Sequence, residues 1–233
     1  MIAPPLVQEH DGILVVRDDH IHGGTKRSFA DQLIAGHREV VYASPVYGGA
    51  QIAIAHAARE LGVQATIFCA KRNLPHPRTM EAHQAGAKIV QVPSGYLSNV
   101  KAKARVYCQQ TGAYLLPFGL ETETAFTAIA ARASAAQQQA GDIDQVWCVG
   151  GSGVLCRGLQ RGISARSFHV VQIGRKLTSA DVGKAKIYVH PLDFAKDAKI
   201  KPPFPSCSNY DAKAWEFVKQ YSAGRVLFWN VMR

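Results

Sequence analysis

The sequence predicts an α/β fold in which parallel sheets are flanked by helices. Apolar segments typical of buried strands alternate along the chain with amphipathic helical segments, the pattern of β-α-β units with right-handed crossovers. A glycine follows several of the helical segments, where it ends the helix. A third observation is the apolar run that passes into Gly150-Gly151-Ser152-Gly153, as a strand does when it enters a helix through a glycine turn.

The expected elements follow one another in a regular order. Short apolar runs predict strands at residues 13–17, 39–43, 64–69 and 88–92. Amphipathic patterns predict helices at residues 26–35, 49–61, 78–85 and 97–110. Later in the chain we expect a buried strand that ends at Gly150, a long helix after residues 115–119, a helix at 211–221 and a last strand at 225–230.

This order predicts two domains. Residues 40–116 form a smaller β/α domain, which is inserted in a larger domain made of residues 1–39 and 117–233. Ligands in such folds bind at the carboxyl ends of the parallel strands. The pair Gly48-Gly49 and the turn that begins at Gly150 both fall there, so both are candidate binding segments.

Lys26 follows Gly23, Gly24 and Thr25 at the start of an apolar-periodic helix. The glycines allow a tight turn and let a flat ligand approach the backbone. A lysine at the edge of a core loses its proton more easily, and the neutral amine can form a Schiff base with an aldehyde, as it does with pyridoxal phosphate. Taken alone, the stretch is better explained as a surface lysine after a glycine turn, because lysines and glycine turns are both common.

The segment from Gly150 to Leu155 is a candidate phosphate site. Successive backbone N–H groups at a helix start bind anions, and the helix dipole adds to their attraction. Ser152 can donate a further hydrogen bond. The glycine spacing matches neither of the common nucleotide-binding motifs, and an ordinary connection between a strand and a helix would look the same.

Together, the two segments resemble the fold type II pyridoxal-phosphate enzymes, whose fold is like that of the tryptophan synthase β subunit. They are most similar to the branch that contains 1-aminocyclopropane-1-carboxylate (ACC) deaminase and D-cysteine desulfhydrase. The R-x-D, G-G-N-K and G-S-G-G-T motifs of that branch have counterparts at residues 17–19, 23–26 and 151–155. Residues 43–62 resemble its substrate loop and the helix behind it, 115–119 its P-x-G loop, and 225–230 its last core strand.

The resemblance implies a role for each matching residue. Lys26 holds pyridoxal phosphate as a Schiff base and, once released, moves a proton at the substrate carbon. The phosphate is held by Gly151, Ser152, Gly153, Val154 and Leu155. Gly48, Gly49 and Asn230 are the further cofactor contacts. Tyr47 is not a family residue: it could supply a hydroxyl or a stacking face, and an ordinary half-buried loop tyrosine explains it equally well. The candidates for the partner of the pyridine nitrogen are Ser206, Ser208, Tyr210 and Asn230.

The chain also departs from the family at the same motifs. Thr25 stands where the branch usually has Asn, and Gly48 and Gly49 stand where it has a cofactor-binding Asn and a Ser. Because that serine is needed to open the cyclopropane ring, we do not expect the ACC deaminase reaction itself. Val154 and Leu155 replace a Gly and a Thr of the phosphate loop, which removes one hydroxyl but keeps both backbone N–H groups.

The positive charge of the chain suggests phosphate-bearing partners. It has 27 Lys and Arg against 17 Asp and Glu, a net charge of +10, and seven positive charges with one negative fall in each of the segments 71–110 and 155–190. Such segments suit DNA, although many basic enzymes bind none. The chain is also similar in size and charge to shortened fold type II enzymes of bacteriophages that hypermodify thymine, which predicts DNA as a partner and the host cytoplasm as the location.

Several other classes of protein are disfavoured. The chain has no apolar run near the roughly 18 residues of a membrane span and no secretory signal pattern. Five scattered cysteines without a C-x-x-C motif indicate reduced thiols, and the nine histidines lack paired metal spacing. We therefore expect a cytoplasmic protein without a metal or a membrane, and the family resemblance implies a homodimer.

The predicted function is a pyridoxal-phosphate-dependent lyase that acts at the α-carbon of an amino acid. The basic segments favour an amino acid attached to a thymine base in phage DNA, where decarboxylation would leave a free amine. Two alternatives stay open. One is a deaminase or desulfhydrase of free amino acids, and the other is a non-catalytic protein of this fold that binds a phosphate ligand or nucleic acid.

Overall fold

The computed structural model describes residues 3–93 and 96–233, and the chain divides into two compact units. Unit 1 comprises residues 1–25 and 122–233, and unit 2 comprises residues 26–121. The sequence placed these boundaries at 39/40 and 116/117. They differ because α1 (Arg27–Ile34) packs on α2 (Ala50–Leu61), and because the Gly119 N–H donates to the Tyr42 hydroxyl, which ties the return segment to unit 2.

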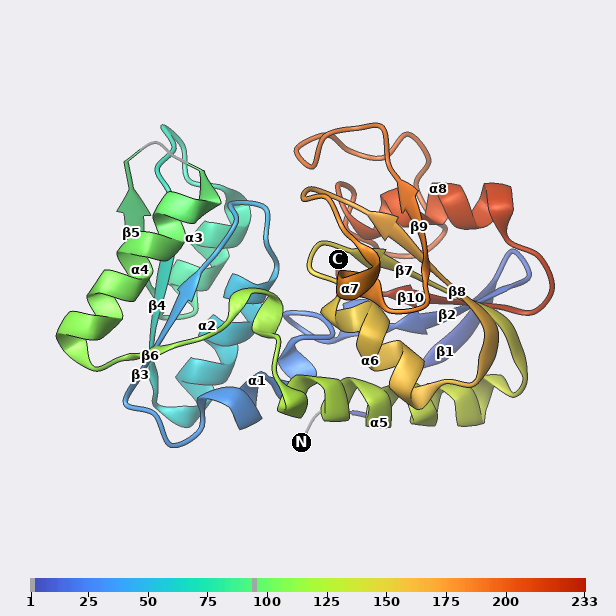
Figure 1. The fold of residues 1–233 in the computed structure, drawn as a ribbon, viewed down its shortest axis with the longest axis horizontal. Helices are drawn as coiled ribbons and strands as arrows, with labels where there is room; N and C mark the ends of the chain where they lie inside the picture. The colour runs from blue at the N-terminus through green and yellow to red at the C-terminus, as the bar shows by residue number, and fades with distance from the viewer. Residues whose placement is uncertain (1–2, 94–95) are drawn as a thin grey trace. The chain divides into compact units, whose positions relative to one another are not determined.

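Unit 1 is built on a six-stranded sheet (Figure 1). Its strand order is β1-β2-β10-β7-β8-β9, with β1 antiparallel to β2 and every other pair parallel. The strands span Val7–His10 (β1), Ile13–Arg17 (β2), Val226–Asn230 (β10), Ile143–Gly150 (β7), Ala165–Gln172 (β8) and Lys186–Val189 (β9). Since β2, β10 and β7 are neighbours, their carboxyl ends bring three distant parts of the sequence together.

Both faces of this sheet are covered, as two neighbouring residues of β7 show. Trp147 stacks on His169 at 4.3 Å and lies 4.9 Å from Tyr188, whose ring meets Phe217 of α8 (Asp211–Tyr221). Cys148 forms a hydrogen bond with Cys156 of α6 (Val154–Gly162). Successive residues of a strand point to opposite faces, so α8 covers one face and α6 the other. The long helix α5 (Glu123–Ala140) packs on α6.

Unit 2 has a four-stranded, fully parallel sheet in the order β5-β4-β3-β6. Its strands span Lys88–Val92 (β5), Gln64–Ala70 (β4), Glu39–Ala43 (β3) and Tyr114–Leu115 (β6). The helix α4 (Leu97–Thr111) covers one face, where Val100 and Ala104 pack against Val41 and Phe68. The other face carries α2, against which α3 (Pro77–Gln84) packs.

Most of the expected elements are confirmed. The strands at 13–17, 39–43 and 88–92 and the helix at 211–221 have the predicted bounds. The strands β1, β8 and β9 and the short helix α7 (Ser179–Val182) lie in segments for which the sequence predicted no element. Among the described residues, no helix combines the length and the apolar character that a membrane crossing requires.

Candidate active site

The glycine turn after β7 has the geometry of an anion-binding loop. The turn joins Gly150 to Val154, the first residue of α6, and its first-turn N–H groups have no acceptor within the helix. Gly153 has φ +86°, and a Cβ there would lie 2.0 Å from the Asp181 carbonyl oxygen. A Cβ on Gly150 would lie 2.6 Å from Val170. The loop therefore needs glycine at both positions, and it presents main-chain donors at the carboxyl end of the sheet.

Two side chains flank this loop. The Tyr210 hydroxyl accepts a hydrogen bond from the Gly151 N–H, and burial, followed by the charge of Asp211, raises the pKa of Tyr210. On the other side, Arg175 pairs with Asp181 and its guanidinium lies 3.5 Å from the Ser152 carbonyl oxygen. A phenol that stays protonated thus stands beside the turn, while the charge of Arg175 is offset by Asp181.

Asp211 is a buried carboxylate next to the same loop, and the sequence analysis did not select it. It is the first residue of α8, is 0% exposed, and accepts a hydrogen bond of 2.9 Å from the Val231 N–H through Oδ1. Its charge contributes to the raised pKa of both Tyr210 and Cys148. The signal available in the sequence was an acidic residue at a helix start, which usually indicates only a favourable charge near the helix dipole.

The loop that carries Lys26 is fixed to the end of β10. The Thr25 N–H donates to the Val231 carbonyl oxygen at 3.1 Å, and a Cβ on Gly24 would lie 2.4 Å from that oxygen. The Thr25 hydroxyl donates to Asp18 at 2.7 Å. Lys26 is half-buried and directly follows Thr25, at the point where α1 begins. Glycine is therefore required before the lysine because the backbone closely approaches another strand.

A buried charged network lies beneath this loop. Asp18 accepts hydrogen bonds from Arg132 and from the Trp229 indole, in addition to Thr25. Asp19 is paired with Arg17 and also accepts from the Asn230 amide at 2.8 Å. Buried charges persist only when they are paired and hydrogen-bonded, and here each carboxylate has an arginine. The network thus holds the segment between β2 and Lys26 in place.

The predicted partners of the pyridine nitrogen fall in different places. Asn230 donates to Asp19 and to the Pro205 carbonyl oxygen, and its own carbonyl oxygen accepts from Ser206. Ser208 donates to Asp197 at 2.7 Å. Of the four candidates, Tyr210 is the one whose hydroxyl contacts the glycine turn. Asp211, the residue after Tyr210, adds a buried carboxylate beside these candidates.

In unit 2, the predicted substrate loop lies between β3 and α2. The Gly48 N–H donates to the Pro45 carbonyl oxygen at 2.9 Å, and the Gln51 side chain donates to the carbonyl oxygens of Val46 and Gly48. Gly49 caps α2, so the loop sits at the positive end of that helix. Tyr47 is half-buried within the loop. The roles of Tyr47, Gly48 and Gly49 toward a ligand stay predictions.

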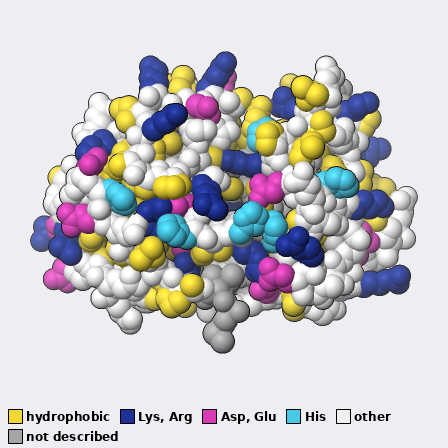
Figure 2. All heavy atoms as spheres, turned by 180° about the vertical axis from the view of Figure 1, so that it is seen from behind, with side chains coloured by type: hydrophobic (Ala, Val, Ile, Leu, Met, Phe, Trp, Pro, Cys, Tyr) yellow, Lys and Arg dark blue, Asp and Glu magenta, His cyan; other side chains and the backbone are white. Residues whose placement is uncertain are grey.

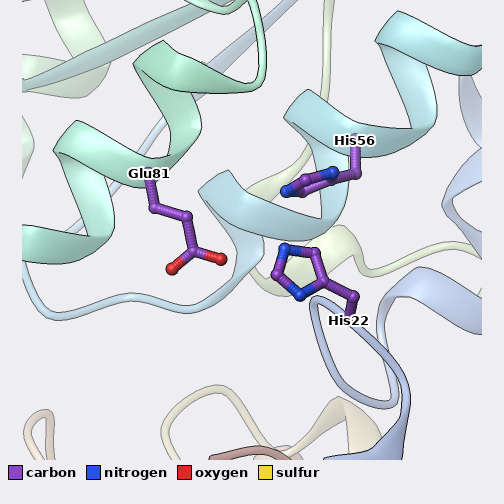
Figure 3. A group of neighbouring side chains, drawn as sticks. All are labelled: His22, His56 and Glu81. Carbon is purple, nitrogen blue, oxygen red and sulfur yellow. The ribbon is translucent and has the colours of Figure 1, made fainter.

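Two metal-ligand side chains also face each other in unit 2. His56 of α2 and Glu81 of α3 point toward one another, with ligand atoms within 4.8 Å (Figure 3). The third residue drawn, His22, belongs to unit 1. Two ligands fall short of the set that a zinc ion takes from a protein, and we assign no metal to them.

Comparisons with known proteins agree with this geometry. The chain resembles three solved structures: an ACC deaminase homologue, threonine deaminase isoform 2 of Solanum lycopersicum in its processed form, and serine racemase of maize. The ACC deaminase homologue matches with a TM-score of 0.81 at 15% identity, over 99% of this chain and 90% of that one. For threonine deaminase the TM-score is 0.69 at 12% identity, over 95% and 75% of the two chains. For serine racemase it is 0.73 at 15% identity, over 98% and 87%. At such identities the likeness shows the fold alone.

The family is decided by the sequence. No curated protein matches the chain. A family model described as "Pyridoxal-phosphate dependent enzyme" matches residues 12–223, which is most of its length. The fold class and the cofactor that the sequence predicted are thus confirmed, and the chain belongs to the family of pyridoxal-phosphate-dependent enzymes.

Proposed function

We propose that this protein is a lyase that uses pyridoxal phosphate to remove a proton from the α-carbon of a free amino acid and eliminate a group from it. The observation that carries the proposal is the convergence on Val231, whose N–H is bound by Asp211 and whose carbonyl oxygen binds the N–H before Lys26. A buried carboxylate and the residue before the lysine are thereby tied to the end of one strand. A lysine for the Schiff base and a charged partner for the ring nitrogen are groups with which proteins hold this cofactor.

The residues of unit 1 fit the phosphate of the cofactor. Gly151, Ser152 and Gly153, with the N–H groups of Val154 and Leu155, would hold it at the start of α6. The hydroxyl that Leu155 lacks has a substitute nearby, because the Tyr210 hydroxyl already contacts the Gly151 N–H. Glycine at residue 153 is required by packing within the protein, because a Cβ there would lie 2.0 Å from the Asp181 carbonyl oxygen, and this contact fixes the course of the loop.

Asp211 would hold the protonated pyridine nitrogen. The cofactor, when bound, supplies an electron sink that stabilises a negative charge on the substrate carbon. A carboxylate at the ring nitrogen keeps that nitrogen protonated and therefore strengthens the sink. This assignment replaces Ser206, Ser208, Tyr210 and Asn230 as the favoured partner.

Lys26 is the residue that we propose to hold the cofactor and to transfer the substrate proton. Its Nζ would hold the cofactor aldehyde before the substrate arrives. Once released, the neutral amine takes the proton from the α-carbon and can return it to the product. Tyr47 is the second group that we propose at the reacting end, where its hydroxyl or ring would contact the substrate.

Covalent labelling tests this function. The full chain is incubated with pyridoxal phosphate, freed of excess ligand, reduced with borohydride and digested for mass spectrometry. We expect a pyridoxyl group on Lys26, no label in Lys26→Ala, and an unchanged label in Lys103→Ala, which removes an exposed lysine of α4. A wild type that takes up no label, or takes it up at another lysine, would refute the assignment.

We favour elimination over decarboxylation because several similar structures are enzymes named for loss of ammonia, although serine racemase and O-ureido-L-serine synthase are also among them. Those named for loss of ammonia are an ACC deaminase homologue, threonine deaminase and diaminopropionate ammonia lyase. A substrate carried on DNA, predicted from the basic segments, is supported by that charge alone. On the face drawn in Figure 2, Lys and Arg side chains lie scattered among other side chains. If the protein is retained on DNA at low salt and this retention weakens steeply as the salt concentration rises, the hypothesis of a DNA-bound substrate would regain support.

The partner chain is a second copy in this proposal. The family resemblance implied a homodimer, and we keep this expectation for the protein in solution. Sedimentation of the full chain measures it directly, and a single species at the 25.3 kDa of one chain would contradict it.

A further inference from the structure

A buried lysine that the proposed mechanism does not use lies in the first turn of α8. Lys213 is 0% exposed, and its Nζ donates to the backbone carbonyl oxygens of Asp193 at 2.6 Å and Leu192 at 3.4 Å. Among the described residues, the partners of this ammonium are thus main-chain oxygens. Burial lowers the pKa of Lys213, although the charges of Asp197 and Asp193 act in the opposite direction.

A lysine is a costly residue at a fully buried position. Lysine side chains are almost never fully buried unless they are paired, and apolar residues of similar volume often stabilise a core at least as well as buried charged groups do. Packing of α8 on the sheet therefore does not require an ammonium at residue 213. What the ammonium adds is a fixed direction for the chain, because it binds two consecutive carbonyl oxygens immediately before Phe194.

The same helix holds the connection from β9 to α8 at a second point (Figure 1). Glu216, three residues after Lys213, accepts hydrogen bonds from the N–H groups of Lys199 and Ile200. Its other carboxylate oxygen lies 3.3 Å from Nε2 of His190. The first half of the connection is therefore attached to α8 on both sides of the residue that follows the lysine-bound carbonyls.

Phe194 is that residue, and its half-buried ring packs on two separate segments of unit 1. The ring centroid lies 5.6 Å from that of Tyr210, just before α8. A Cβ on Gly174, which follows β8 and has φ +84°, would lie 3.3 Å from the Phe194 ring. The ring therefore contacts the chain that enters α8 and the chain that leaves β8.

Both of these segments contact the glycine turn after β7. The Tyr210 hydroxyl accepts a hydrogen bond from the Gly151 N–H. On the other segment, the Ile173 N–H donates to the Gly150 carbonyl oxygen at 3.0 Å. A displacement of the Phe194 ring would therefore reach the turn from two directions, and the N–H groups that we assign to the phosphate belong to that turn.

We propose that Lys213 is a positioning residue for the phosphate of the cofactor and that it acts through Phe194. The ammonium fixes the backbone at Asp193. The Phe194 ring then supports Tyr210 and Gly174, which keep the N–H groups of the glycine turn directed at the phosphate. This inference rests on the proposed function, because it takes the glycine turn as the phosphate site.

Binding of deoxypyridoxine phosphate to the full chain tests the inference. This cofactor analogue has the ring and the phosphate but no aldehyde, so its affinity does not depend on a Schiff base with Lys26. Deoxypyridoxine, which lacks the phosphate, is the comparison ligand, and calorimetry measures both affinities. We expect Lys213→Met to weaken the phosphate ligand by roughly three- to tenfold, about the contribution of one hydrogen bond, and to leave deoxypyridoxine unchanged.

A second variant and a matched control make the result specific. Phe194→Ala alters a half-buried side chain outside the helix and should weaken the phosphate ligand to a similar extent. Because both substitutions act through one contact, the double variant should bind it no more weakly than the more affected single variant. Lys219→Met removes another lysine of α8, which is 40% exposed and paired with Asp11, and should change neither affinity.

Several results would overturn the inference. Equal weakening of both ligands by Lys213→Met would show that the lysine serves the fold alone, and unchanged phosphate binding would remove it from the site. Additive losses in the double variant would show that Lys213 does not act through Phe194. If Lys213→Met does not fold, Phe194→Ala decides: selective loss of the phosphate ligand supports the inference, and unchanged binding refutes it.

The two proposals can fail separately. A wild type that binds deoxypyridoxine phosphate but takes up no borohydride-trapped label on Lys26 would refute the proposed lyase and leave the phosphate site with its positioning residue. A wild type that is labelled on Lys26 but binds the two analogues equally would refute the phosphate site, and the role of Lys213 with it, while the lysine assignment would stand.

Discussion

Asp18 is the residue whose substitution most directly tests how the lysine loop is held. Its carboxylate is 0% exposed and accepts from Arg132 at 2.6 Å and 2.8 Å, from Thr25 at 2.7 Å and from Trp229 at 3.0 Å. Asp18→Asn conserves the shape but removes the charge that faces Arg132. Because one partner of a buried ion pair is then left uncompensated, we expect a loss of about 3–5 kcal/mol in the free energy of unfolding.

For a chain of this length, each kcal/mol lowers the melting temperature by about 2–4 °C, so the midpoint should fall by roughly 6–20 °C. Chemical unfolding, followed by the fluorescence of the buried tryptophans, measures the free energy directly. The matched control is Asp31→Asn, which removes a carboxylate that is 43% exposed from its pair with Arg27. Exposed pairs contribute up to about 1 kcal/mol.

The reasoning is refuted if Asp18→Asn costs no more than the control. A second readout connects the network to function. Since Thr25 directly precedes Lys26, loosening its hydroxyl from Asp18 should lower the yield of borohydride-trapped pyridoxyl at a temperature where the variant is still folded. A folded variant that labels as fully as the wild type would show that the network serves stability alone.

Two further predictions follow from local geometry. Gly153→Ala should weaken pyridoxal-phosphate binding by at least about tenfold, since the new Cβ meets the Asp181 carbonyl oxygen at a positive φ. The control is Gly141→Ala, which also lies at a positive φ but has nothing within 4 Å of its Cβ. This control variant should bind pyridoxal phosphate normally. Burial would raise the pKa of Glu216, but hydrogen bonds from backbone N–H groups and His190 lower it overall. Its stabilisation is therefore present above the ordinary pKa of 4.5 and lost as pH falls through the lowered value, so melting temperatures of wild type and Glu216→Gln should converge in acid.

The fold was largely predictable because its signals are local. Apart from one charged residue at an end, the runs Ile13–Arg17 and Glu39–Ala43 are apolar, as strands covered on both faces are. Glycine after α2 and α4 adopts the left-handed conformation that ends a helix. The strands β1 and β9, at four residues each, are too short for a periodic pattern to be detected.

The site was predictable only in part, for a related reason. The turn from Gly151 to Gly153 and the Gly-Gly pair before Lys26 are contiguous motifs whose backbone needs can be inferred from residue type. The function of Asp211 depends on burial, which results from packing of α8 on the sheet. In sequence it is indistinguishable from a surface acid at a helix start, such as Glu123 at the start of α5.

Val231 links two distant segments that carry residues of the proposed site. Its peptide N–H and carbonyl oxygen bind Asp211 and Thr25, so the candidate ring-nitrogen partner and the residue before Lys26 are set by a single extended residue after β10. Neither hydrogen bond depends on the Val231 side chain. The residue type at this position therefore does not predict either bond. The positions of Asp211 and Thr25 are thus set by main-chain hydrogen bonds to one residue, which a search for residue-type motifs does not detect.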